Sequence, residues 1–455
     1  MTGSPGKEGV RRDGYGPTSP IVGERGARTR RRIVAETLTL FETQGFHGTS
    51  VEGIAKAAGT SRATLYQYFA SKEEIFVELL DECGSALMRV VRRIGPLGPT
   101  RLGFDNLHWW LGEWTYVHDK YATMFAQWAG IESTGQTIRP LVLGFSQAYD
   151  ARIARRLETC ELHGLAPTDA AIALTSIMHR FNYFRHLGLI STPGPDTLLD
   201  GLAVTVQLVL FPETPPDVFP VRPSAFPLVE PHPAPPPGRT TPHPDTPRIV
   251  DRTSDLRPRA ARTARRLIDA GAVLFAERGY HATAVDDIAA ASGHARGTFY
   301  KYFDEKLDLL LQLTLECGAA MGPLAASFAA LDPADPDRRP LRDWLTDYLA
   351  FRARYVGVLR AWLEGTSRDP RLLDAVGEVA AELRDAALAV FARADRPYPI
   401  EPPIAAAVLG ALLERMPEAI AERAADRPDA QIVEVMAAVI ERGLLGASAL
   451  GIAAL

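Results

Sequence analysis

The sequence is poor in several features that would each define a class of protein. Its 455 residues include only three cysteines, widely spaced and without a C-x-x-C pair. This excludes a disulfide scaffold and a zinc finger, and predicts reduced thiols in a cytoplasmic protein. Neither sign of charge prevails, because 50 Lys and Arg stand against 55 Asp and Glu, for a net charge of −5. Any binding to nucleic acid must therefore come from local basic patches.

Long apolar runs and enzyme motifs are lacking as well. The longest runs, such as residues 201–211, are too short to span a bilayer, and residues 1–20 contain no apolar signal core. We expect a cytoplasmic protein without membrane contact that begins with a disordered, partly basic tail. No GxxxxGK[ST], HExxH or GxSxG motif occurs, and no GxGxxG follows a strand. Because these motifs are absent, we predict no enzymatic activity and no cofactor. The histidines are scattered along the sequence, so we also predict no metal site.

One module occurs twice in the chain. The segment FETQGFHGTSVEGIAKAAGTSRATLYQYF begins at Phe41, and FAERGYHATAVDDIAAASGHARGTFYKYF matches it without a gap from Phe275, at an offset of 234 residues. A chance match of this length is not credible. We therefore predict a tandem duplication.

The remainder of the sequence predicts an all-α protein with a linker between the two copies. Residues 211–247 are rich in proline, which interrupts both helix and sheet and favours a semi-extended chain. Elsewhere the apolar residues have helical spacing, and no convincing alternating strand is present. Each copy is expected to be a three-helix helix-turn-helix head followed by an α-helical ligand-binding or dimerisation domain. The predicted domains are a tail (1–27), a first head (28–75), a first helical half (76–211), a linker (212–258), a second head (259–309) and a second helical half (310–455).

The first head divides into short helices separated by glycine turns. A helix over about 29–44 ends at Gly45, a suitable left-handed C-cap. Thr49 is predicted to begin the next helix, with Glu52 completing a capping box. Gly59 allows a sharp turn before the helix SRATLYQYF. This helix–turn–helix pattern is typical of proteins whose second helix enters the DNA major groove.

The second helix of the motif carries groups that suit DNA. Hydroxyl, guanidinium, amide and phenol groups can bond to phosphates or base edges, and helix N-termini favour phosphate. Arg28, Arg30, Arg31 and Arg32 are expected to form a basic arm upstream. The predicted DNA-binding residues are Thr60, Ser61, Arg62, Thr64, Tyr66, Gln67, Tyr68 and Lys72 in the first head, and His294, Arg296, Gly297, Thr298, Tyr300, Lys301, Tyr302 and Lys306 in the second.

At these residues the chain resembles the TetR family of bacterial repressors. The family phrase is approximately T-x-x-x-I-A-x-x-A-G-V-S-x-G-T-[LF]-Y-x-[YH]-F-x-x-K, and both copies carry it, over about 28–80 and 262–314. The resemblance implies a sequence-specific transcriptional regulator, expected to be a repressor, that binds a palindromic or pseudo-palindromic operator in double-stranded DNA. It also implies a helical ligand-binding and dimerisation domain behind each head, with an effector shifting the heads.

The two heads differ at the start of the second helix. Thr60 and Ser61 of the first head are replaced by His294 and Ala295, which removes a hydroxyl N-cap. Lys301 stands where the first head has glutamine. We expect the heads to read different half-sites, and the alternative is a degenerate second head.

Aromatic residues gather in the first helical half and predict a pocket for a small hydrophobic effector. Ordinary core packing is the alternative for any one of them. The second half has fewer aromatics and is expected to serve dimerisation through helices near 403–424 and 430–446. The predicted ligand-binding residues are Trp110, Trp114, Phe125, Trp128, Phe181 and Phe184.

Two heads in one chain predict an intramolecular pseudo-dimer on an imperfect palindrome. A homodimer of two-headed chains is the alternative arrangement. The alternative function is a ligand-binding or scaffold protein in which one or both heads no longer bind DNA.

Overall fold

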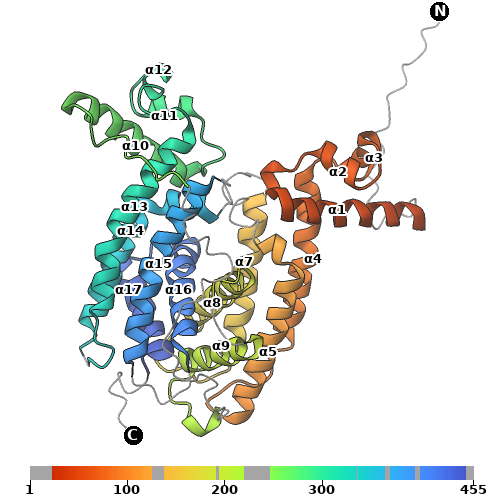
Figure 1. The fold of residues 1–455 in the computed structure, drawn as a ribbon. Helices are drawn as coiled ribbons and strands as arrows, with labels where there is room; N and C mark the ends of the chain where they lie inside the picture. Colours follow the sequence, from red (N-terminus) through yellow and green to blue (C-terminus); the bar gives the residue numbers. More distant parts are fainter. Residues whose placement is uncertain are drawn as a thin grey trace, which may run out of the picture. The chain divides into compact units, whose positions relative to one another are not determined.

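The computed structural model describes residues 23–125, 138–190, 194–219, 246–335, 337–363, 369–394 and 400–446. Across these ranges the regular elements are helices and none is a strand, which confirms the predicted all-α class (Figure 1). The chain divides into two compact units, of which the first ends at Cys83 and the second begins at Gly84. Residues 1–22 of the predicted disordered tail lie outside the described residues, whereas residues 24–27 are helical and begin α1.

The first unit contains the first head. Gly45 has a φ of 74° and interrupts α1 where the sequence predicted the helix end. The next helix begins differently from the prediction, because its N-cap is Ser50, whose hydroxyl accepts a hydrogen bond from the Gly53 amide at 3.0 Å. Thr49 instead turns inward and donates to the Gly45 carbonyl at 2.7 Å. The helices of this unit are α1 (Glu24–Gly48), α2 (Val51–Ala57), α3 (Arg62–Tyr68) and the beginning of α4 (Lys72–Arg92).

The second unit holds both helical halves and the second head. The first half continues from α4 into α5 (Arg101–Lys120), α7 (Ile138–Leu157), α8 (Pro167–His186), α9 (Pro195–Leu210) and the short turn η1 (Pro216–Val218). The second head consists of α10 (Pro258–Arg278), α11 (Val285–Ala291) and α12 (Arg296–Phe299). The second half comprises α13 (Lys306–Ala329), α14 (Arg339–Leu363), α15 (Pro370–Arg393), α16 (Pro402–Arg423), α17 (Asp429–Ile440) and the π-helical turn η2 (Glu441–Leu445).

Both ends of the predicted linker pack against folded elements, so the linker is shorter than 212–258. At its start, Phe219 is buried and meets the Phe104 ring edge-on, with the ring centroids 5.2 Å apart. At its end, Arg252 donates to the Tyr302 carbonyl of the second head at 3.3 Å. Proline content marked the whole segment as a linker but could not show which residues find tertiary contacts. Residues 220–245 lie outside the described ranges.

Helix α13 is long and apolar enough to resemble a membrane span. The sequence prediction rested on uninterrupted apolar runs alone and did not identify this helix. It is 24 residues long, and a window of it reaches a mean hydropathy of 1.3. However, 56% of that window is buried inside the protein. The helix packs against α14 and α15, and a buried core helix meets the same criteria of length and composition.

Helices α8 and α16 join the two helical halves. They come from different halves of the chain and lie side by side (Figure 1). The aromatic ring of Phe184 lies close to Gly410, where an added Cβ would stand 3.5 Å from it. Next to this contact, the Arg180 Nε lies 2.5 Å from the Glu414 Oε1, and both side chains are largely buried. The halves are therefore joined by apolar packing together with a buried ion pair.

Two further ion pairs cross between the halves. Arg423 at the end of α16 pairs with Asp150 of α7. Arg427, which follows α16, lies 2.6 Å from Asp169 of α8. In both pairs the arginine comes from the second half and the carboxylate from the first, whereas the pair between α8 and α16 has the opposite polarity.

We expect Arg180→Met to lower the free energy of unfolding by about 3 kcal/mol, because it leaves a buried carboxylate without its nearest cation. The double variant Arg180→Met/Glu414→Leu should recover most of that loss, since two apolar side chains can replace a buried pair. Denaturant unfolding of the four proteins of this double-mutant cycle measures the coupling. The control is Arg339→Met, whose exposed pair with Asp337 should contribute little to the free energy of unfolding. Additive effects of the two substitutions would contradict the pairing.

Candidate functional site

The first head presents an exposed arginine–tyrosine pair on α3. Gly59 has a φ of 58°, which allows the turn between α2 and α3. Ser61 caps α3 by accepting a hydrogen bond from the Thr64 amide at 3.0 Å. The next residue, Arg62, donates from its guanidinium to the hydroxyl of Tyr66, one turn along the helix, at 3.3 Å. The guanidinium lies 5.5 Å from the centroid of the Tyr66 ring. Tyr66 remains 45% exposed, so the pair faces solvent.

The second head repeats this geometry. Gly293 has a φ of 75° and turns the chain into α12. Arg296 donates to the Tyr300 hydroxyl at 3.3 Å and lies 5.7 Å from that ring, and Tyr300 is 44% exposed. Here Arg296 also pairs with Asp286 of α11 at 2.9 Å. The pairs occupy matched positions of the repeat, and we call the exposed residues around them the recognition faces of the two heads.

Most of the predicted DNA-binding residues lie on these recognition faces. On the first, Ser61, Arg62, Tyr66 and Gln67 are exposed, and Thr60, Thr64 and Tyr68 are partly exposed. On the second, Arg296, Gly297, Tyr300 and Lys301 are exposed, and His294, Thr298 and Tyr302 are partly exposed.

Lys72 and Lys306 bind backbone carbonyls within their own heads. The Lys72 ammonium donates to the carbonyls of Phe46 and Thr49 at 2.7 and 3.0 Å, and burial lowers its pKa. Lys306 makes the equivalent bonds in the second head, to Tyr280 and to Thr283, both at 2.6 Å. Each lysine thus satisfies backbone carbonyls inside its own head, and phosphate binding by it stays a prediction.

Arg30 also serves the fold of its head rather than an upstream basic arm. It donates to the Tyr68 carbonyl at 3.0 Å, pairs with Glu78 and covers the Phe69 ring at 4.2 Å. The matched position of the second head is an alanine. There Arg252, from the segment before α10, reaches the equivalent Tyr302 carbonyl. Sequence reasoning missed Arg252 because it lies outside the aligned repeat.

Loss of the hydroxyl cap accompanies a shorter recognition helix in the second head. Ala295 occupies the N-cap of α12 and makes no side-chain cap bond. Helix α12 covers only Arg296–Phe299, whereas the capped α3 covers Arg62–Tyr68. The predicted inequality of the two heads therefore has a structural counterpart at the helix that carries the recognition face.

Ala295→Ser should stabilise α12, because a serine N-cap contributes about 1 kcal/mol relative to alanine. We expect slower hydrogen exchange of the α12 amides, measured by mass spectrometry on the full chain. The matched control is Ser61→Ala, which should accelerate exchange in α3 by a similar factor. Unchanged protection in α12 would show that the missing hydroxyl does not limit this helix.

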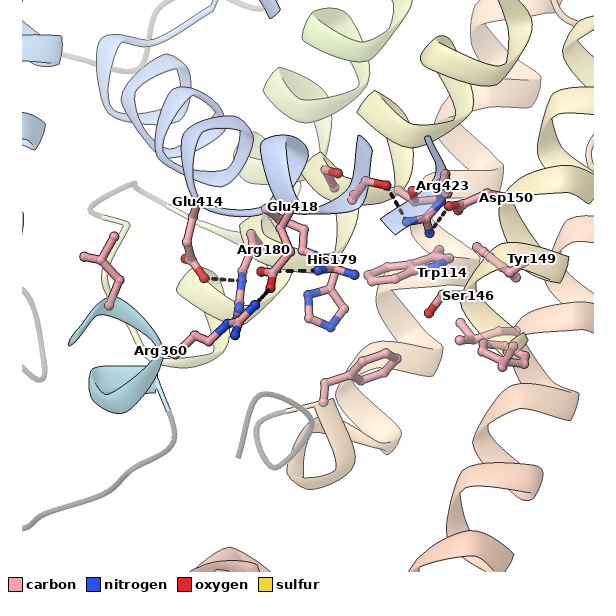
Figure 2. Close-up of a pocket in the computed structure, with 18 of the residues that line it drawn as sticks. Trp114, Ser146, Tyr149, Asp150, His179, Arg180, Arg360, Glu414, Glu418 and Arg423 are labelled. Carbon is pink, nitrogen blue, oxygen red and sulfur yellow. Dashed lines mark hydrogen bonds and ion pairs between the residues drawn. The ribbon is translucent and has the colours of Figure 1, made fainter. Parts of the chain in front are cut away.

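A cavity of about 100 Å³ lies in the second unit, lined by residues of α4, α5, α7, α8, α14 and α16 (Figure 2). Of the predicted ligand-binding residues, Trp114 and Phe125 line it. Trp110 is fully buried and donates to the Val90 carbonyl at 3.2 Å.

The other predicted ligand-binding residues do not line this cavity. Phe181 is buried in the core, Phe184 lies near Gly410, and Trp128 lies outside the described residues. Charged side chains share the wall of this cavity with the apolar ones, a mixture that the prediction of a pocket for a hydrophobic effector did not anticipate.

Burial and arginines set the protonation of these charged groups. Burial raises the pKa of Asp150 and of Glu414, although arginines oppose the shift in both cases. Burial would also raise the pKa of Glu418, but Arg360 and its neighbouring arginines outweigh it and bring the value to about 2. The pKa of His179 lies well below its usual value, because the ring is buried and Arg180 is near.

The described residues offer no group of three or more His, Cys, Asp or Glu side chains that could hold a metal ion.

Comparison with known proteins identifies the two heads. The family model "Bacterial regulatory proteins, tetR family" matches residues 33–79 and again residues 267–313. An uncharacterised HTH-type transcriptional regulator, YdgC of Bacillus subtilis, is 33% identical over 70 residues, which are 15% of this chain and 36% of the relative. IcaR of Staphylococcus aureus, a negative transcriptional regulator of the biofilm operon icaADBC, is 27% identical over 97 residues, 21% of this chain and 51% of the relative.

These curated relatives are matched over about a third and a half of their own length. A crystal structure of a TetR/AcrR-family regulator from Thermobifida fusca has 19% identity and a TM-score of 0.31, with 40% of this chain and 97% of that chain covered. A similarity of that extent supports no argument about function.

The chain is thus a tandem helix-turn-helix protein. Each head matches the domain of the tetR family of bacterial regulatory proteins, so the chain carries that domain twice.

Proposed function

We propose that the protein is a sequence-specific DNA-binding transcriptional regulator that acts as a repressor in the cytoplasm. The observation that carries this proposal is the exposed Arg–Tyr pair, present at matched positions of both heads directly after a positive-φ glycine turn. Arginine can bond to guanine edges or phosphates, and the tyrosine hydroxyl can bond to phosphate. Repression is favoured by the relative IcaR, which is named a negative regulator.

We further propose that the two helical halves of one chain form an intramolecular pseudo-dimer. The packing of α8 against α16 supports this arrangement, as do the three ion pairs that cross between the halves. Helices α8 and α16 both begin at a proline, and counting from Pro167 and Pro402 places His179 at the position of Glu414. A second copy of α8 would therefore offer Arg180 no carboxylate at that position, whereas α16 of the same chain does.

This pairing predicts a single-chain particle. Light scattering during size exclusion should give a mass near 49.5 kDa, the mass of one chain, across a wide range of protein concentrations. A stable particle of twice that mass would instead favour a homodimer of two-headed chains.

Selection of bound sequences from a random pool of double-stranded DNA should enrich a site with two half-sites. Tyr66→Ala and Tyr300→Ala should each weaken binding to it by about tenfold, because each removes the aromatic hydroxyl and the group that holds its arginine. Affinities at two salt concentrations separate base contacts from phosphate contacts. Tyr116→Ala is the matched control, since Tyr116 is 68% exposed on α5 and belongs to neither head.

The outcomes of this experiment distinguish the alternatives. Loss of binding with only one of the two tyrosines would mean that the other head no longer contributes. Absence of any enriched site would favour a ligand-binding or scaffold protein with retired heads.

A further inference from the structure

We propose that the cavity of the second unit binds one small monoanion with an apolar body, such as an aromatic carboxylate of the size of benzoate. This inference names the ligand class of an effector, so its regulatory role rests on the proposed function. Binding itself can be measured without DNA.

The cavity has an apolar side that fits one ring. Trp114, Phe125 and Phe145 line it together with Leu87 and Leu359. Its volume of about 100 Å³ is well below that of a site for a drug-sized ligand, about 300 Å³ or more. It is closer to the roughly 150 Å³ of an engineered cavity that binds benzene. The ligand is therefore a single ring or a short chain.

Two buried donors in the wall point to a ligand that accepts hydrogen bonds. Trp114 is 3% exposed and Ser176 is 2% exposed. Within the described residues, neither the Trp114 Nε1 nor the Ser176 Oγ has a hydrogen-bond partner. An indole N–H can only donate, and a buried donor without an acceptor is costly. Both residues line the cavity, and a carboxylate there would supply acceptors to both groups once their side chains turn toward it.

The charges around the cavity favour an anion. Figure 2 shows two groups of side chains on opposite sides of His179. One group is Arg180, Arg360 and Glu414, and the other is Trp114 and Tyr149. The wall contains more arginines than carboxylates. A further carboxylate, Glu422, does not line the cavity but pairs with Arg415 and Arg423. The arginines of the wall are Arg180, Arg352, Arg360, Arg415 and Arg423, and the carboxylates are Asp150, Glu414 and Glu418.

Burial disfavours the charged forms of two of the three wall carboxylates. Burial raises the pKa of Asp150 and of Glu414, which favours their neutral forms. A bound carboxylate would offset the remaining positive charge within a site that is largely removed from water.

Both halves of the chain contribute to this wall, which predicts one site per chain. Asp150 and Ser176 belong to the first half, whereas Arg352 and Glu418 belong to the second. A ligand there contacts both sides of the α8–α16 junction. It can change DNA affinity only to the extent that it binds one arrangement of the halves more tightly than another.

Arg360 links the wall of the cavity to the second head. Its guanidinium pairs with Glu418 and also donates to the Ala276 carbonyl near the end of α10, at 2.9 Å. Helix α14, which carries Arg360, packs directly on α10, where Gly357 leaves no room for a side chain against the α10 backbone. A ligand that draws Arg360 toward itself would therefore act on the helix that begins the second head.

Isothermal titration calorimetry of the full chain with benzoate tests the site. We expect one benzoate per chain, with the neutral isostere benzamide and the cation benzylamine binding at least about tenfold more weakly. Trp114→Phe keeps the ring and removes the indole N–H, and should weaken benzoate by about tenfold. Trp109→Phe is the matched control, because Trp109 is exposed on the same helix and should leave the affinity unchanged.

Each contrary result overturns a specific part of the proposal. Equal affinities for benzoate and benzamide, or no saturable heat at millimolar benzoate, would refute an anion site. Two benzoates per chain would refute a site shared between the halves. If benzoate binds as expected but leaves operator affinity unchanged, the site stands and its role as an effector site fails. If no operator is bound at all, the proposed function fails while the calorimetric result still decides the site.

Discussion

The contact between α8 and α16 is the constraint on which the rest of the second unit depends, because it joins two halves from distant parts of the chain. Apolar packing supplies most of its stability, but buried charges must be paired or they cost several kcal/mol each. Arg180 of α8 pairs with Glu414 of α16. The carboxylates Asp150 of α7 and Asp169 of α8 pair with arginines at the end of α16 and just after it. Two of these three pairs, Arg180 with Glu414 and Arg423 with Asp150, also line the cavity, so the junction and the candidate ligand site share these residues.

The two heads maintain one fold with partly different residues. Lys72 and Lys306 bind equivalent pairs of carbonyls, so here the sequence repeat and the structural repeat coincide. The carbonyl of Tyr68 receives Arg30 from α1, whereas the equivalent carbonyl of Tyr302 receives Arg252 from outside the repeat. What the fold requires at this point is a guanidinium donor, and its position in the sequence can change.

Features that depend on local sequence were predictable, and features that depend on distant partners were not. The glycine turns, the two heads and the helices near 403–424 and 430–446 follow from spacing within a few residues, and the structure has them. Lys72 contacts carbonyls 23 and 26 residues away in the sequence, and its charge alone could not indicate these contacts. Likewise, aromatic content could not show that Trp114 lines a cavity while Trp110 is locked in the core, because the cavity wall is assembled from six separate helices.

Joining two family domains in one chain permits an asymmetry that identical subunits cannot have. In a homodimer every substitution appears on both sides of the axis, so an arginine that needs a carboxylate must find it in a copy of its own sequence. Here His179 and Glu414 have diverged at matched positions, and so have the serine and alanine that precede α3 and α12. Divergence of the first kind allows unlike charges to meet at the junction and to enclose one cavity between the halves. Divergence of the second kind leaves one recognition helix with a hydroxyl cap and the other without it, so the two heads are no longer equivalent in their response to a single effector site.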